Sequence, residues 1–257
     1  MIKKIRTFTI TCIMCCLLIG CEENAYFPLT QGLQKSFTIS IEFENEPPVY
    51  YRIFSTFLKK VKITNEISTE KEMISVTPML REDASVFYYY EDKNNVKRIA
   101  YQPLGKDQIV YEEEPRYIIK YPVKKGAMWK NPSKTYLLLK HYPYYNKRIT
   151  VPFKVNAIIE DVNATVKVPA GIFKNCIKIK SSGETTFIGE RGIGDVKVQV
   201  ENVDWFAPEI GLIKTTRTET TSTDLYGKNI LIKELESYKI PILSLIHISE
   251  PTRRYAI

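Results

Sequence analysis

Few side chains in this 257-residue chain have the reactivity that catalysis needs. A general base is most often a histidine, because its pKa lies close to neutral pH. The chain has two, His141 and His247. His247 lies in a C-terminal tail that is interpreted below as non-native. His141 is followed by tyrosines, and we expect it to be a packed or surface residue. We therefore expect neither histidine to be a catalytic base.

Cys176 is the remaining candidate for a nucleophile. A thiol attacks only after a neighbouring base has taken its proton, and the sequence around Cys176 offers none. Alternation along its strand places Cys176 opposite Ile177 and Ile179, on the face of Lys178 and Lys180. We expect a structural thiol and a protein that is not an enzyme.

One histidine and one free cysteine are also too few ligands for zinc, so neither a metal nor a cofactor is expected.

The cysteine with the clearest chemistry is at the start of the chain. An apolar run from Phe8 to Ile19 is too short to cross a bilayer, which takes roughly 20 apolar residues. Basic residues precede this run, and a small residue and a cysteine follow it, as in a secretory signal: Lys3, Lys4, Arg6, Gly20, Cys21. Residues 1–20 are therefore predicted to be a signal peptide and not a membrane-spanning helix.

The segment Leu18-Ile19-Gly20-Cys21 resembles the lipobox of bacterial lipoproteins. The resemblance implies that the thiol of Cys21 receives a diacylglyceryl group and that cleavage leaves Cys21 as the new amino terminus. It also implies a place in the cell envelope, most often on the outer membrane, facing the periplasm or the cell surface. The alternative is an ordinary signal peptide that happens to contain cysteines, since Cys12, Cys15 and Cys16 lie in the same run.

Removal of residues 1–20 lowers the formal net charge from +8 to +5, because this segment carries three basic residues and no acidic ones. Such a mild excess, spread along the chain, is not typical of nucleic-acid binding. Four of the five cysteines lie in the signal or at its cleavage point, so only Cys176 keeps a free thiol and no internal disulfide can form. The fold must depend on its hydrophobic core.

The C-terminal segment from Leu243 to Arg253 resembles a translated adapter used in preparing sequencing libraries. Residues 243–257 are therefore set aside as a non-native tail; the alternative is a genuine polar tail.

The rest of the chain favours strands. Residues 21–36 are interpreted as a lipid-anchored tether, and 37–242 as one β-rich domain. Phe37, Ile39 and Ile41 alternate with polar residues, as in a half-buried strand. The segment 49–63 fits helical spacing as well as alternation, and strand is preferred. Short strands joined by polar turns continue to Tyr238, so the expected fold is mainly β, an antiparallel curled sheet or half-barrel with at most one short helix.

Three segments carry a second resemblance: 166–173 (Val-Lys-Val-Pro-Ala-Gly-Ile-Phe), 205–212 (Trp-Phe-Ala-Pro-Glu-Ile-Gly-Leu) and 120–129, with Tyr121-Pro122 and Trp129. Together they resemble a loosely defined group of bacterial envelope lipoproteins. Members of that group are thought to form antiparallel half-barrels similar to the lipoprotein carriers LolA and LolB. The resemblance implies a fold and no catalytic residue.

The functional hypothesis is a lipid-anchored, non-enzymatic envelope protein that binds an apolar ligand or a protein partner. The aromatic clusters Phe87–Tyr90 and Tyr142–Tyr145 put rings on both faces of their strands, which suits a groove for a lipid or a sugar. The alternative is an envelope hydrolase. It requires a carboxylate such as Glu112 or Asp204 within hydrogen-bond reach of His141 or of a hydroxyl.

Overall fold

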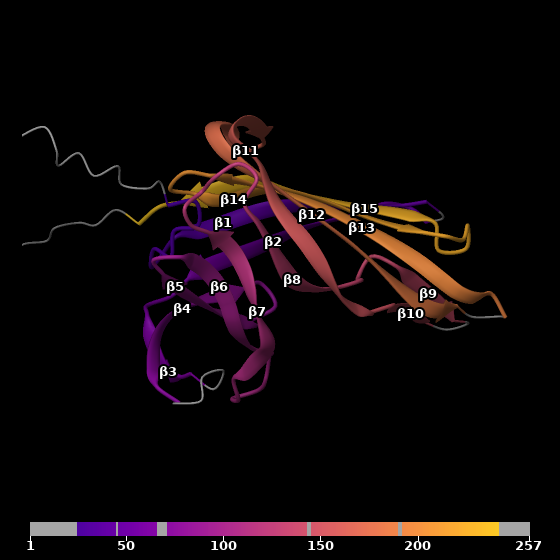
Figure 1. Cartoon of the computed structure of the whole chain (residues 1–257), viewed down its shortest axis with the longest axis horizontal. Coiled ribbons are helices and arrows are strands. Elements are labelled where there is room, and N and C mark those ends of the chain that lie inside the picture. Colours follow the sequence, from indigo (N-terminus) through magenta and orange to yellow (C-terminus); the bar gives the residue numbers. More distant parts are fainter. Residues whose placement is uncertain (1–24, 45, 66–70, 143–144, 190–191, 242–257) are drawn as a thin grey trace, which may run out of the picture.

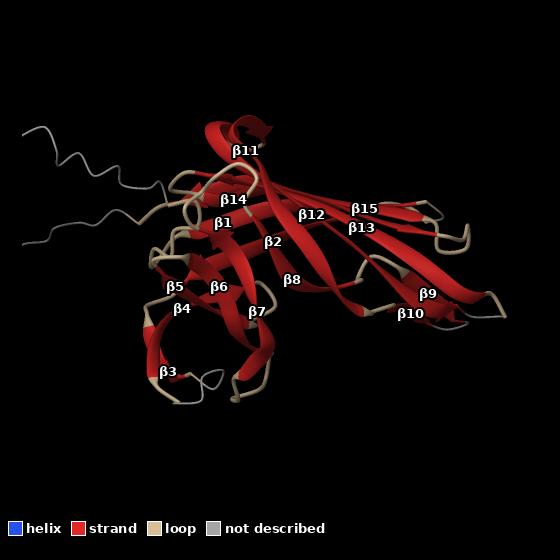
Figure 2. Cartoon of the chain, in the orientation of Figure 1, coloured by secondary structure: helices blue, strands red, loops and turns tan. Residues whose placement is uncertain are grey.

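The computed structural model describes residues 25–241, apart from 45, 66–70, 143–144 and 190–191 (Figure 1). The strands are β1 (Gln34–Phe43), β2 (Val49–Phe57), β3 (Val61–Thr64), β4 (Met73–Arg81), β5 (Val86–Asp92), β6 (Asn95–Gln102), β7 (Val110–Lys120), β8 (Met128–Lys134), β9 (Leu139–Tyr142), β10 (Tyr145–Arg148), β11 (Pro152–Val168), β12 (Gly171–Gly189), β13 (Gly194–Ala207), β14 (Gly211–Thr221) and β15 (Lys228–Lys239). Figure 2 shows only strands and loops in this part of the chain. No helix that could cross a bilayer occurs in the described residues.

Thirteen strands form one antiparallel sheet in the order β7-β6-β5-β4-β2-β1-β15-β14-β13-β12-β11-β8, with β3 paired to β4. The sheet curls on itself, so that β7 and β8, at the two ends of this order, come together. Strands β9 and β10 form a separate hairpin. The prediction of a mainly β, antiparallel curled sheet is confirmed.

Local sequence explains the strand assignments. Phe37, Ile39 and Ile41 of β1 are buried, as their alternation predicts. The ambiguous segment 49–63 forms β2 and β3, so the preference for strand is confirmed. A tight turn at residues 208–210 follows β13. There Glu209 and Gly211 adopt φ angles of 61° and 86°, a left-handed conformation that glycine reaches without strain.

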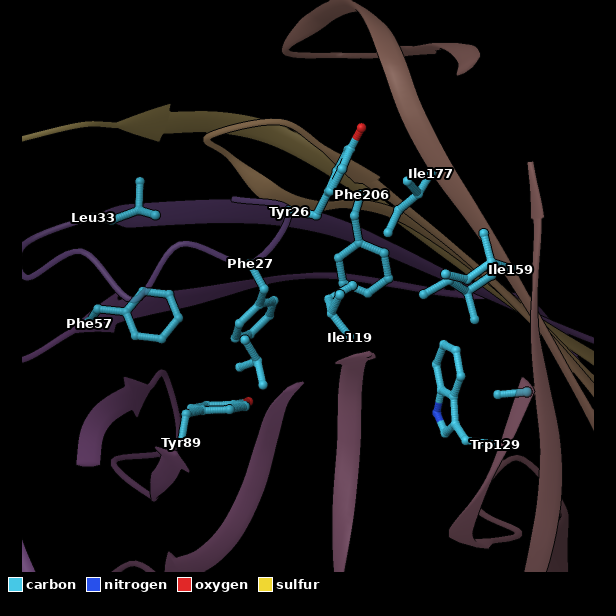
Figure 3. Close-up of a cluster of buried hydrophobic side chains, with 13 residues drawn as sticks. Tyr26, Phe27, Leu33, Phe57, Tyr89, Ile119, Trp129, Ile159, Ile177 and Phe206 are labelled. Atoms are coloured by element: carbon cyan, nitrogen blue, oxygen red, sulfur yellow. The ribbon is translucent and has the colours of Figure 1, made fainter. Parts of the chain in front are cut away.

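The segment before β1 is packed, although the sequence favoured a tether through residue 36. Tyr26, Phe27 and Leu33 are buried in the largest apolar cluster (Figure 3). Phe27 lies at the centre of three rings, with centroid distances of 5.8 Å to Phe57, 5.1 Å to Tyr89 and 6.3 Å to Phe206. The packed part of the chain therefore begins earlier than expected, because these apolar side chains fill one end of the curled sheet.

Both ends of the described chain lie at that same end of the sheet. The backbone N–H of Glu209 donates to the carbonyl of Ala25 at 3.0 Å, and a Cβ on Gly32 would lie 3.3 Å from Pro241. In Figure 1 the first and last described residues leave the sheet on one side, and the β9–β10 hairpin lies on the other.

One side chain closes the sheet. Asn131 of β8 accepts a hydrogen bond from the backbone N–H of Tyr117 at 2.9 Å and donates one to the carbonyl of the same residue at 2.7 Å. The amide thus takes the place of a neighbouring strand for one residue of β7. An exposed ion pair between Lys154 and Glu114, at 2.6 Å, also links β11 to β7, but such pairs stabilise little.

Replacing Asn131 by Ala should lower the free energy of unfolding by about 2 kcal/mol, because both backbone groups of Tyr117 lose their partner. Asn131 is 8% exposed, so water does not replace the amide easily. Urea unfolding measures the change, and amide hydrogen exchange at Tyr117 should become faster. The control is Asn156→Ala, at an exposed position of β11, which should change stability by less than about 0.5 kcal/mol. Equal effects of the two substitutions would contradict this role of Asn131.

Candidate functional site

The inside of the curled sheet holds a hollow of about 470 Å³. Its apolar wall consists mainly of aromatic and branched side chains from ten strands, the segment before β1 and the segment after β8: Phe27, Ile39, Ile53, Tyr89, Ile118, Trp129, Tyr136, Val155, Ala157, Ile179, Phe206, Leu212, Leu231. Its polar wall contains charged, amide and hydroxyl groups: Arg81, Glu82, Arg116, Asn131, Ser133, Ser181, Asn202, Asp204, Thr215, Arg217, Lys233. Sizes of this order suit one small ligand.

Trp129 is the largest apolar side chain of the wall and carries an unused donor. The residue is 6% exposed, and its indole Nε1 has no hydrogen-bond partner among the described residues. Figure 3 shows the ring reaching toward Ile159, with Ile119 and Phe206 on its other side. A buried indole N–H without a partner costs free energy, so an acceptor placed in the hollow would be favoured there.

Arg217 and Glu219 form a buried ion pair at 2.9 Å, with side chains 3% and 0% exposed. Glu219 also accepts hydrogen bonds from the backbone N–H groups of Tyr136 and Leu137, at 3.0 and 3.1 Å. Arg217 donates to the carbonyl of Lys134 at 2.7 Å. Because both charges are used in holding the chain after β8, this pair is structural.

Asp204 lies in the wall of the hollow, and its carboxylate accepts two hydrogen bonds. The hydroxyl of Thr215 and the amide of Asn202 each donate to its carboxylate at 2.6 Å. Burial raises the pKa of Asp204 above its usual value, against the opposing effect of these hydrogen bonds. A carboxylate within reach of a hydroxyl is the arrangement that the hydrolase alternative required.

Arg116 and Lys233 are the two cations of the wall whose side chains have no anionic or hydrogen-bond partner. Within the described part of the chain, neither side chain forms a hydrogen bond or an ion pair. Lys233 lies 4.1 Å from the centroid of the Phe37 ring, and burial lowers the pKa of its ammonium group to about 8. Burial, followed by repulsion from Arg98, lowers the pKa of Arg116. Both remain cations at neutral pH.

Cys176 is fully buried, in a different apolar cluster from Ile177 and Ile179. This agrees with the predicted alternation, which puts the thiol and those two isoleucines on opposite faces of the strand. The pairing of β12 with β11 is irregular here, because the register shifts near Ala164 and Asn175 adopts a φ of 54°. Burial raises the pKa of the thiol to about 11, so at neutral pH it is a neutral core residue.

The other predicted residues are spread over the fold. Glu112 pairs with Arg98 at 2.6 Å, outside the hollow. Of the first aromatic cluster, Tyr89 lines the hollow and Tyr88 packs in a separate cluster, so rings do lie on both faces. Cys21 and the side chains of His141 and Tyr142–Tyr145 lie outside the described residues. Among the described side chains, no three metal-binding groups gather.

Sequence reasoning missed Arg116, Lys233 and Trp129. For Lys233 a signal was present, because it stands between Leu231 and Leu235 on the apolar face of an alternating strand. A lysine at such a position is buried, and a buried charge is a candidate for binding. For Arg116 and Trp129 no comparable signal exists.

Lys35 is a second buried lysine, next to the hollow but not in its wall. It is 5% exposed and donates to the carbonyl of Ile210 at 3.0 Å. Burial, and then repulsion from Lys233, lowers its pKa from 10.5 to about 7. Between these two values the unfolded chain binds more protons at this site than the folded one, so the free energy of unfolding rises with pH.

Lys35→Met should remove this dependence. The stability of the variant relative to the parent should be highest below pH 7 and should fall by up to about 1.4 kcal/mol per unit as the pH rises toward 10. Urea unfolding at a series of pH values measures the difference. Lys239→Met, at an exposed position of β15, is the control and should show a difference that does not vary with pH. A constant difference for Lys35→Met would contradict the buried-lysine assignment.

Comparison with protein-family models finds no match, and comparison with curated proteins finds none either. Two solved structures are similar. One is described as an exported protein with a YmcC-like fold from Bacteroides fragilis, with 12% identity and a TM-score of 0.43. The other is described as a lipoprotein from Parabacteroides distasonis, with 12% identity and a TM-score of 0.35. Each likeness covers 83% of this chain and 98% of the other. At these TM-scores the functional proposal rests on the hollow itself.

Proposed function

We propose that this chain is a lipid-anchored protein of the bacterial envelope, held on the outer membrane, that binds a small, partly apolar molecule inside its curled sheet without transforming it. The observation that carries the proposal is the hollow of about 470 Å³. One part of its wall consists of aromatic and branched apolar side chains, and another part consists of polar side chains. Pockets with these properties are typical of small-molecule sites.

The anchor and the hollow are adjacent in the chain. Only three residues lie between Cys21 and Ala25, which makes four steps along the chain, and an extended chain spans at most about 3.6 Å per step. An acylated Cys21 would therefore hold the end of the sheet that carries Tyr26 and Phe27 within about 15 Å of the lipid. Because Phe27 lines the hollow, the ligand would be bound close to the membrane surface.

Cys21→Ala should move the protein from the membrane fraction to the soluble fraction, because a bilayer holds the chain only through its acyl groups. Fractionation and intact mass spectrometry measure the change, and the parent should show a mature chain that begins at an acylated Cys21. The control is Cys16→Ala, within the segment expected to be removed. An unchanged mass and fractionation of Cys21→Ala would overturn the anchor.

Filling the hollow should abolish ligand binding. Ser133 is half-buried in the wall, and Ser133→Trp places a large ring in the space. N-phenyl-1-naphthylamine, an uncharged probe that fluoresces in apolar surroundings, should bind the parent and not the variant. Ser182→Trp is the control, since Ser182 is exposed on β12, and it should bind as the parent does. Equal binding by all three proteins would place the probe elsewhere and contradict the proposal.

Two alternatives each have one observation in their favour. The pair Asp204 and Thr215 favours a hydrolase. Incubation with p-nitrophenyl decanoate distinguishes a hydrolase from a binding protein, because a binding protein leaves the ester intact.

The exposed aromatic side chains of β2 favour a protein partner, because Tyr50 and Phe54 are 71% and 54% exposed. A partner that docked on β2 would not compete with N-phenyl-1-naphthylamine for the hollow.

A further inference from the structure

We infer that the hollow selects a small amphiphile with an oxyanion head group, which Arg116 and Lys233 receive while the aromatic wall holds the tail. The inference rests on the proposed function, because it names the chemical class of ligand for the same hollow. It goes further in assigning the cations a role in recognition.

The charges of the wall leave these two cations unmatched. Arg217 is paired with Glu219, and Arg81 contacts Glu82 at 3.5 Å. Asp204 is near enough to influence the pKa of both Arg116 and Lys233, yet it forms an ion pair with neither and accepts its two hydrogen bonds from Asn202 and Thr215. The unpaired groups of the wall thus sum to an excess of positive charge.

A ligand anion would compensate this excess. A half-buried cation without a partner is incompletely solvated, and a hydrogen bond from a charged donor to an oxyanion is among the stronger protein contacts. A guanidinium can present two parallel N–H groups to a carboxylate or phosphate, and an ammonium adds a point charge. Structural arginines in this fold have carbonyl or carboxylate partners, as Arg217 does, so the lack of any for Arg116 sets it apart.

The rest of the wall explains why the ligand would also carry a tail. Trp129, Phe206, Ile179 and Ala157 lie in one apolar cluster and all line the hollow. The buried Nε1 of Trp129, which has no hydrogen-bond partner among the described residues, is a neutral donor within that apolar part. A free inorganic anion would leave this surface in contact with water, whereas an amphiphile would cover it.

Two ligands with the same tail test the inference. Isothermal titration of decanoate and of 1-decanol into the full chain should show decanoate binding about tenfold or more tightly, since one charge-assisted contact distinguishes them. Inorganic phosphate should bind far more weakly than decanoate. Arg116→Gln and Lys233→Met should each weaken decanoate about tenfold and leave 1-decanol unchanged. Lys130→Gln, exposed on β8, is the matched control and should change neither affinity. Thermal unfolding confirms that each variant is folded.

The outcomes distinguish a failure of this inference from a failure of the proposed function. If decanoate and 1-decanol bind equally and Ser133→Trp abolishes both, the hollow binds ligands but the anion preference is wrong. Phosphate binding as tightly as decanoate would overturn the amphiphile class and leave an anion site. Binding of neither decanoate nor 1-decanol would overturn the proposed function, and this inference with it.

Discussion

The curled sheet depends on the two hydrogen bonds that the amide of Asn131 makes to the backbone of Tyr117. Strands β7 and β8 stand at opposite ends of the strand order, and every other neighbouring pair on that path is joined by a backbone ladder. A side-chain amide carries an acceptor oxygen and a donor nitrogen, so one residue can match both the N–H and the carbonyl of an extended chain. Among the described residues no backbone ladder joins β7 to β8, and this amide supplies the hydrogen bonds between them.

The hollow follows from this closure and from the sequence of the inward face. Along β13, β14 and β15 the wall is apolar at Phe206, Leu212 and Leu231 and polar at Asp204, Thr215 and Lys233. Apolar side chains alone would collapse on one another and fill the space. Charged groups resist that collapse, because each would have to lose water without gaining a partner. The mixed wall therefore keeps the hollow open and gives it a chemical preference.

The segment before β1 connects this interior to the expected anchor. Phe27 contacts rings from β2, β5 and β13, and the backbone of Ala25 is hydrogen-bonded at the turn after β13. An acyl anchor on Cys21 would hold this end of the sheet within about 15 Å of the bilayer. In the proposed arrangement the membrane and the hollow lie near one another, which suits a ligand that partitions between lipid and protein.

The sequence by itself determined the class of fold, because alternation of apolar and polar residues is a local property of each strand. It also places the expected acylation site at Cys21 and shows that Cys176 is the one cysteine within the described residues. It did not predict the burial of Tyr26 and Phe27 or the meeting of Arg116, Trp129 and Lys233. Those features depend on which strands become neighbours and in what register, and on the closure of the sheet between residues far apart in the chain. Only the tertiary structure decides such contacts, since they arise from long-range packing that no single segment encodes.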